Sequence, residues 1–200
     1  MNVRLSRDFV IPAATIFQDE FHINIYNISI DFITVSDVAS DHNIAYERIN
    51  HWLYNVFADS VMVINGNPHC KALSTVTRVI ELPDEPVDQI VNMMLFAKLN
   101  AITENRMRIT DIELSSNLGD QVRYLHCEEE TTGPFDDNGW WCDPRPNCGD
   151  AKGHKGKKVV SMLDRPNDPT WRDLGLGWAD EDHVDAERKV MFVFNKDEPK

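Results

Sequence analysis

The order of apolar periodicities between residues 21 and 127 constrains the fold of this chain most. Five runs of alternating or β-branched apolar residues predict strands: 21–35, 60–64, 75–82, 106–114 and 121–127. Apolar residues at helical spacing predict helices over residues 40–60 and 85–102. The order is strand, helix, strand, strand, helix, strand, with one additional strand. It predicts an α+β fold with a ferredoxin-like split βαβ core, in which two helices cover one face of an antiparallel sheet.

The first predicted strand, FHINIYNISIDFITV, changes the phase of its alternation near its middle. Its apolar residues occupy odd positions as far as Ile25 and even positions from Ile28 onward. A period of two cannot skip a residue without a local irregularity. We therefore expect a β-bulge or a bend at Tyr26–Asn27.

The character of the chain changes after residue 127. Gly, Pro, Asp, Asn and Trp replace the periodic apolar pattern over residues 128–188, and KVMFVF over 189–194 resembles a strand again. We expect an α+β core domain over 1–127, an acidic irregular elaboration over 128–188, and a returning strand with a polar tail over 189–200. A loop of this length is functional, is disordered, or contains elements that the pattern does not reveal.

The charge balance narrows the classes of partner. The chain has 20 basic and 33 acidic residues, a formal net charge of −13. Such a chain is repelled by phosphate backbones, so nucleic-acid binding is disfavoured and a basic protein surface or a cation is the natural complement. The alternative is that the acids only keep the domain soluble.

Neither a membrane anchor nor a secreted framework is predicted. The longest apolar runs are far below the roughly 20 residues of a spanning helix, and Asp8 and Pro12 interrupt the apolar stretch near the N-terminus. Four unevenly placed cysteines do not resemble a disulfide scaffold. These features predict a cytoplasmic protein with reduced thiols.

The stretch from His126 to Lys158 concentrates residues that can bind metals. Its potential zinc ligands are Cys127, Cys142, Cys148 and His154. Five residues separate Cys142 from Cys148, and five more separate Cys148 from His154, whereas structural zinc sites typically space paired cysteines more closely. We therefore expect no cofactor, with zinc as the alternative.

The same stretch also has the composition of a recognition surface. Two adjacent indoles stand among acids, as aromatic anchors do at interface hot spots. The candidate partner-binding residues are Trp140, Trp141, Asp136, Asp137, Glu128, Glu129 and Glu130. The alternative is that the tryptophans fill the core. No catalytic motif of known spacing occurs, so no catalytic residue is assigned.

Three segments, VIPAATIFQDEFHI, AYERINHWLYNVF and ELSSNLGDQVRYLHCEEETTGPFDDNGWWC, resemble uncharacterised conserved proteins of tailed bacteriophages of marine bacteria. The resemblance implies an intracellular phage product, acting in the host cytoplasm, and transfers no ligand or catalytic residue. Together with charge and loop composition it predicts a non-enzymatic accessory protein that acts by contact with a host or phage protein. The alternatives are a minor virion or assembly component that forms a self-complementary homo-oligomer, and a zinc-containing enzyme or zinc-stabilised binding module.

Overall fold

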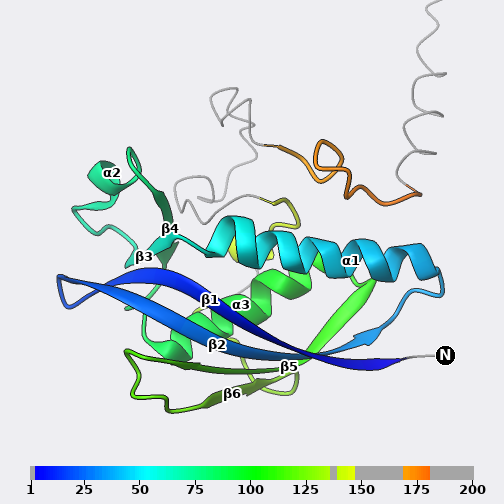
Figure 1. Ribbon diagram of the computed structural model, residues 1–200, viewed down its shortest axis with the longest axis horizontal. Coiled ribbons are helices and arrows are strands. Elements are labelled where there is room, and N and C mark those ends of the chain that lie inside the picture. Colours follow the sequence, from blue (N-terminus) through cyan, green and yellow to red (C-terminus); the bar gives the residue numbers. More distant parts are fainter. Residues whose placement is uncertain (1–2, 136–138, 147–168, 181–200) are drawn as a thin grey trace, which may run out of the picture.

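The computed structural model describes residues 3–135, 139–146 and 169–180. The strands in these ranges are β1 (Arg4–Phe17), β2 (Glu20–Thr34), β3 (Ser60–Ile64), β4 (Arg78–Leu82), β5 (Met107–Ser116) and β6 (Tyr124–Cys127). The α-helices are α1 (Ala39–Trp52), α2 (Cys70–Leu73) and α3 (Asp88–Thr103). A π-helical turn, Leu53–Phe57, extends α1, and a 3-10 turn covers Trp140–Cys142. Figure 1 shows the long β1–β2 hairpin with its tip beside α2.

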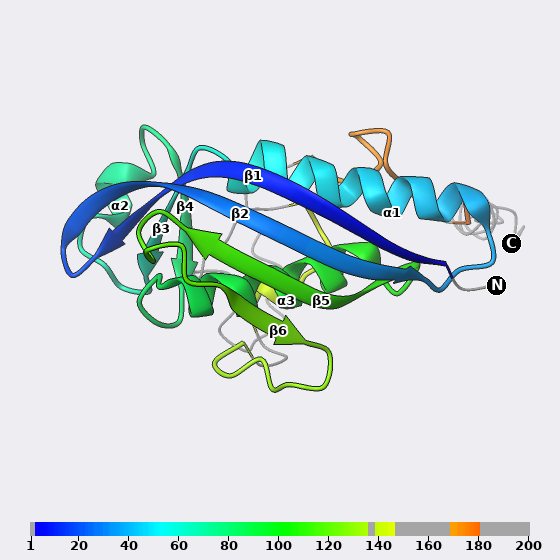
Figure 2. The same cartoon turned by 60° about the horizontal axis from the view of Figure 1, so that its bottom comes forward.

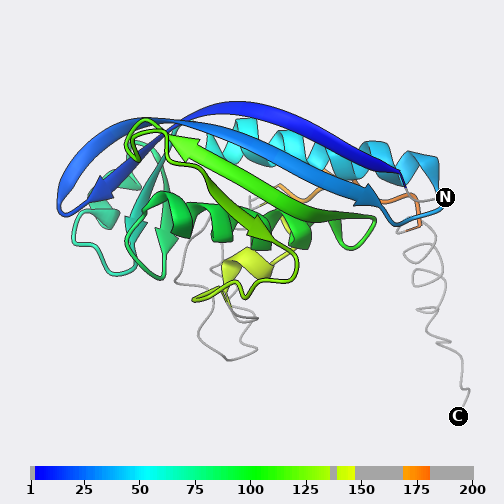
Figure 3. The same ribbon diagram turned by 90° about the horizontal axis from the view of Figure 1, so that it is seen from below.

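The described strands form one sheet in the order β4-β3-β1-β2-β5-β6. The pairs β1–β2, β2–β5 and β5–β6 are antiparallel, whereas β1–β3 and β3–β4 are parallel. Figure 2 shows how β1, β2, β5 and β6 follow one another across the sheet. Helices α1 and α3 cover the same face of this sheet (Figure 3). The molecule therefore has one helical layer and one sheet layer, as expected of an α+β fold.

The ferredoxin-like arrangement within that class is not what the structure has. Strand β1, which no sequence pattern predicted, lies between β2 and β3, and β3 pairs with β4 in parallel. Asp8 and Pro12 disguise β1 in the sequence, because proline argues against a central strand. Pro12 lies before β1 gains β3 as its second neighbour, at the pair Ala14–Val61. The proline therefore precedes the residues of β1 that pair with β3, and its carbonyl accepts a hydrogen bond from the Asp59 amide at 3.1 Å.

The predicted bulge at Tyr26–Asn27 is also absent. The β1–β2 register runs without interruption through both residues. The register between β2 and β5 shifts between Asp31 and Phe32, where the extra residue is Thr110 of β5. Even-numbered residues from Asn24 to Phe32 face the helices and are buried. The odd-numbered residues Phe21, Ile23 and Ile25 lie on the outer face and are exposed. The change of phase therefore marks the point from which, toward the hairpin tip, the outer face of β2 is apolar and the inner face is polar.

The two main helices form as predicted and close the core. Helix α1 buries Ala45, Ile49 and Trp52, whose spacing places them on one face. Helix α3 buries a stripe of apolar residues, namely Val91, Met94, Leu95, Leu99 and Ile102. Both stripes belong to one cluster with the inner faces of β1, β2 and β5. The core therefore fixes one face of the sheet against the helices.

The predicted division at residues 127 and 188 stays a prediction, and residues 189–200 lie outside the described ranges. The structure describes parts of the segment between them, at 128–135, 139–146 and 169–180. Within the described residues, no helix combines the length and the apolar composition that crossing a membrane requires.

Candidate functional site

Five polar side chains meet under the helices at the hairpin end of the sheet. They are Thr15, Asn24, Tyr26, Asp88 and Ser116, here called the polar cluster, and each is at least nine-tenths buried. Asn24 and Tyr26 are successive inward residues of β2, and Ser116 of β5 lies directly opposite Tyr26. Thr15 of β1 is diagonal to Asn24, which pairs with Ala13. The first turn of α3 adds Asp88.

The β5–β6 turn, residues 117–121, covers this cluster through a few hydrogen bonds. Ser116 Oγ donates to Asp88 Oδ1 at 2.7 Å and accepts from the Gly119 amide at 3.1 Å. The Leu118 amide donates to Asn24 Oδ1 at 3.1 Å. A Cβ at residue 119 would collide with Asp88 Oδ2, so any residue other than glycine would have to displace this carboxylate. The turn therefore depends on the same groups that it covers.

Several polar atoms of the cluster are buried without a hydrogen-bond partner among the described residues. They are Thr15 Oγ1, Asn24 Nδ2, Tyr26 Oη and Asp88 Oδ2. The Asn24 side chain lies close enough to the Tyr26 hydroxyl to lower its pKa as a hydrogen-bond partner, although the geometry between the two groups falls short of a hydrogen bond. Leaving a buried polar group unpaired costs about 1–3 kcal/mol. An arrangement with four such atoms in one place is therefore expensive for the fold and suited to a ligand.

Burial dominates the acid–base properties of the cluster. It raises the pKa of Asp88 above its ordinary value of 3.8, and the hydrogen bonds from Ser116 oppose the rise only in part. Burial also raises the pKa of Tyr26, with Asn24 opposing and the charge of Asp88 adding to the rise. The cluster thus combines a carboxyl group that holds its proton more strongly than usual with a phenol that remains protonated.

The predicted recognition tryptophans lie elsewhere, and Trp140 is not exposed. Its side chain is 1% exposed, and its indole N–H donates to the Glu81 carbonyl at 2.9 Å. The ring stacks on Trp52 with centroids 6.4 Å apart, and Lys98 Nζ lies 5.7 Å from its centre. Trp140 therefore fills the core, the alternative that the sequence left open, and offers no contact surface to a partner.

Trp141 is half-buried and packs edge-on against Trp140 and Phe135. A Cβ at residue 139 would overlap its indole, so Gly139 allows the ring to lie over the backbone. Among the predicted acids, Glu128 lies 3.4 Å from Arg108, and Glu130 accepts from the Cys127 amide at 3.3 Å. A partner-binding role for Trp141, Glu128, Glu129 and Glu130 stays a prediction. Asp136 and Asp137 lie outside the described residues.

The zinc alternative remains a prediction. Of its four candidate ligands, Cys148 and His154 lie outside the described residues, while Cys127 and Cys142 are half-buried. Within the described residues, no group of three or more His, Cys, Asp or Glu side chains could hold a metal ion.

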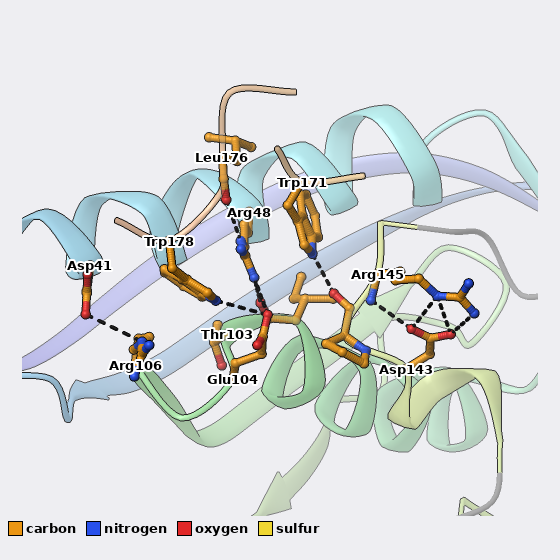
Figure 4. Close-up of polar contacts among 12 residues, drawn as sticks. Asp41, Arg48, Thr103, Glu104, Arg106, Asp143, Arg145, Trp171, Leu176 and Trp178 are labelled. Carbon is orange, nitrogen blue, oxygen red and sulfur yellow. Dashed lines mark hydrogen bonds and ion pairs between the residues drawn. The ribbon is translucent and has the colours of Figure 1, made fainter. Parts of the chain in front are cut away.

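A second buried charge, Arg48 of α1, holds residues 169–180 against the body (Figure 4). Its guanidinium donates to the carbonyls of Leu176 at 2.9 Å and Ile102 at 3.1 Å, and to Glu104 Oε1 at 2.6 Å. The guanidinium carbon lies 3.7 Å from the centre of the Trp178 ring, a cation–π contact. Trp178 also donates to Glu104 Oε1 at 3.0 Å. These contacts make Arg48 a clamp for the segment rather than an open site.

His126 of β6 is expected to make the stability of the fold depend on pH. It is 3% exposed, its ring packs edge-on against Phe96 with centroids 4.6 Å apart, and Glu130 lies 3.4 Å from Nδ1. Burial lowers its pKa below 6.5, and Glu130 offsets this only in part. Because His126 has the higher pKa in the unfolded state, the unfolded state binds the proton first as the pH falls. His126 therefore does not lower the free energy of unfolding above pH 6.5, and it lowers this free energy increasingly as the pH drops below 6.5.

We therefore expect the urea midpoint of the protein to decrease on going from about pH 7.5 to about pH 5, where His126 must be protonated. The replacement His126→Gln removes this titration, so its midpoint is expected to decrease less over the same interval. His51, whose pKa burial also lowers, remains in both proteins and cancels in the comparison. Equal decreases in the two proteins would assign the acid sensitivity to other groups.

No sequence prediction pointed to the polar cluster, and the reason lies in β2. With a bulge at Tyr26, Asn24 would face outward, where a polar side chain is ordinary. With a continuous period of two, Asn24 becomes a buried amide on the helix-covered face, which is the available sequence signal. Asp88 and Ser116 offer no comparable signal, because acids in the first turn of a helix and serines at strand ends are ordinary.

The comparisons with known proteins give structural similarity alone. No family model and no curated protein sequence matches the chain. An uncharacterized protein from Wolinella succinogenes has a TM-score of 0.45 at 8% identity, covering 64% of this chain and 99% of that one. The 6-pyruvoyl tetrahydropterin synthase of Plasmodium falciparum has a TM-score of 0.42 at 14% identity, covering 62% and 96%. The Plasmodium vivax enzyme has a TM-score of 0.41 at 9% identity, covering 63% and 97%.

The structure corrects the prediction of a non-enzymatic accessory protein that acts by protein contact, because Trp140, the expected anchor of the contact surface, is buried. The solved structures that resemble the chain include enzymes. With TM-scores below 0.5, the similarity assigns neither an activity nor a ligand to this chain. Nothing in the comparisons bears on the resemblance to phage proteins, which stays a prediction.

Proposed function

We propose that the protein binds a small polar molecule in the polar cluster, with Asp88 as its principal anchor. The observation that carries the proposal is the gathering of four buried polar atoms without partners at one end of the sheet. Buried polar groups are normally satisfied, and exceptions that cluster call for a functional explanation. The cost of these atoms to the fold is recovered when a ligand pairs with them.

The atoms define the chemistry of the ligand. Ionised Asp88 accepts hydrogen bonds through Oδ2, and Asn24 Nδ2 donates them, while the hydroxyls of Thr15 and Tyr26 can do either. A complementary molecule presents an N–H donor beside a carbonyl or ring-nitrogen acceptor. A primary amide is the simplest group with both.

The cluster is also suited to proton transfer. A carboxyl group whose pKa burial raises is a candidate general acid or base, because catalytic groups work best with pKa values near the working pH. Tyr26 stays protonated and holds the ligand as a hydrogen-bond donor or acceptor. Asp88 then takes a proton from a bound N–H or O–H group, or returns one to it.

Entry requires movement of the β5–β6 turn. Asn117, Leu118 and Asp120 of the turn are exposed, and two backbone amides, those of Leu118 and Gly119, tie it to the cluster. Opening the turn would break these two bonds and uncover Asp88. Short loops that close over a ligand in this way separate the reacting groups from water.

The test uses acetamide as the probe and the backbone amide signals of Leu118 and Gly119 as reporters in NMR spectra. Acetamide is expected to shift both signals to saturation in the unmodified protein. Asp88→Asn keeps the side-chain size and the Ser116 contact but removes the charge, so binding is expected to weaken by about tenfold or more, as for a lost hydrogen bond to a charged group.

The control is Asp37→Asn, which changes an exposed carboxylate outside the cluster and is expected to leave acetamide binding unchanged. Equal saturable shifts in the unmodified protein and in Asp88→Asn would show that Asp88 is not the anchor. The complete absence of saturable shifts in the unmodified protein would contradict the site itself.

A further inference from the structure

A second candidate site lies at the tip of the β1–β2 hairpin. A pocket of about 370 Å³ opens there between the hairpin and the segment that contains α2. Its apolar lining includes Phe21, Ile23, Val61, Leu73 and Val76. The residues from β2 are the odd-numbered ones of its outer face, whereas the polar cluster uses the even-numbered ones of the inner face. The pocket and the cluster are therefore different sites.

The apolar groups around the pocket are unusually exposed. Ile23 is 81% exposed, Val76 80% and Phe21 57%. Each belongs to a different strand position or loop, yet all three line one hollow. Contiguous exposed apolar surface on a small domain marks a binding site more often than chance. The volume also lies in the usual range of small-molecule pockets, about 300–1,000 Å³.

An exposed acid, Asp59, also lines the pocket. The Asp59 amide donates to the Pro12 carbonyl at 3.1 Å, and Thr77 Oγ1 donates to the Asp59 carbonyl at 3.0 Å, so its backbone is held from both sides. Its φ of 58° is a left-handed conformation that Asp and Asn tolerate better than most residues. Within the described residues, no hydrogen bond or ion pair to its carboxylate is found. The carboxylate is therefore available to pair with a cationic group of a ligand.

We propose that this pocket binds a small amphiphilic amine. The ammonium group pairs with Asp59, and the aliphatic or aromatic body lies against Phe21, Ile23 and Val76. The formal net charge of −13 favours the approach of cations over anions of the same size. The apolar lining supplies most of the affinity, and Asp59 supplies the choice of charge.

The test compares phenethylamine with phenethyl alcohol and phenylacetate, using the backbone amide signals of Val61 and Thr77 as NMR reporters. Phenethylamine is expected to shift them to saturation and to bind more tightly than the alcohol, with the anion weakest. Asp59→Asn keeps a residue that tolerates positive φ. It is expected to weaken amine binding about three- to fivefold, as befits an exposed ion pair, and to leave binding of the alcohol unchanged.

A second variant, Ile23→Ser, removes an apolar wall at a position so exposed that folding is expected to be unaffected, which the urea midpoint verifies. It is expected to weaken the amine and the alcohol equally. Phenylacetate binding as tightly as the amine, or an amine affinity unchanged in Asp59→Asn, would overturn the role of charge. No saturable shift with any of the three compounds would overturn the pocket as a site.

Discussion

Replacing Trp140 by alanine is expected to destabilise the protein by about 3–5 kcal/mol, the cost of removing a fully buried tryptophan. The variant loses the stacking on Trp52, leaves the Glu81 carbonyl without its indole donor, and uncovers Lys98. The measurement is the free energy of unfolding in urea, followed by circular dichroism so that the lost tryptophan does not alter the signal.

Trp141→Ala is the matched control, since it removes the neighbouring indole of the same turn. Trp141 is only half-buried, so we expect the loss to be roughly half as large. A contact-surface role would give the opposite pattern, with both variants stable and both deficient in binding. A loss at Trp140 no greater than that at Trp141 would therefore contradict its assignment to the core.

Replacing Arg48 by methionine is expected to cost about 3 kcal/mol and to release residues 169–180. The substitution leaves Glu104 and the carbonyls of Leu176 and Ile102 without their buried partner, and breaking one side of a buried pair is costly. Because Glu104 is partly exposed, it regains some hydration, so the expected loss is at the low end of such cases. Hydrogen exchange measured by mass spectrometry should show faster exchange over 169–180.

Arg106→Met provides the comparison for this clamp. Arg106 also lies over the Trp178 ring, with its guanidinium carbon 5.4 Å from the ring centre, and it pairs with exposed Asp180 and buried Asp41. Its own side chain is 31% exposed, whereas that of Arg48 is fully buried, and exposed pairs contribute at most about 1 kcal/mol. We therefore expect a smaller loss of stability than in Arg48→Met, and intact protection over 169–180. Unchanged protection in Arg48→Met as well would show that Arg48 does not hold the segment.

The parts of the fold that could be predicted from sequence are those with long, uninterrupted periodicity. The apolar stripes of α1 and α3, the run SVMVI of β3 and the β5–β6 hairpin each follow a single pattern to their ends. Strand β1 could not be recognised in the same way, because Pro12 and an exposed polar first half conceal its alternation. Missing one central strand was enough to give the wrong sheet order.

The candidate site was beyond prediction for a different reason. Polar cluster residues come from β1, β2, the start of α3 and the end of β5, so only the tertiary fold brings them together. The composition of the stretch after His126 indicated a binding site, yet Trp140 of this stretch lies in the core. Aromatic residues next to acids therefore indicate a surface only when the register of their surroundings is known.

If the polar cluster lowers stability in exchange for ligand binding, the loss is measurable as a free energy of unfolding in urea, compared between the unmodified protein and Asp88→Asn from about pH 8 to about pH 3. Burial raises the pKa of Asp88 in the folded state, so its charge destabilises the fold above that pKa, and the penalty disappears as pH falls toward 3.8. We expect Asp88→Asn to be the more stable protein at neutral pH, and the difference in unfolding free energy to close in acid. If Asp88→Asn is instead the less stable protein at neutral pH, Asp88 acts as a structural acid in the first turn of α3, and the polar cluster is not a binding site.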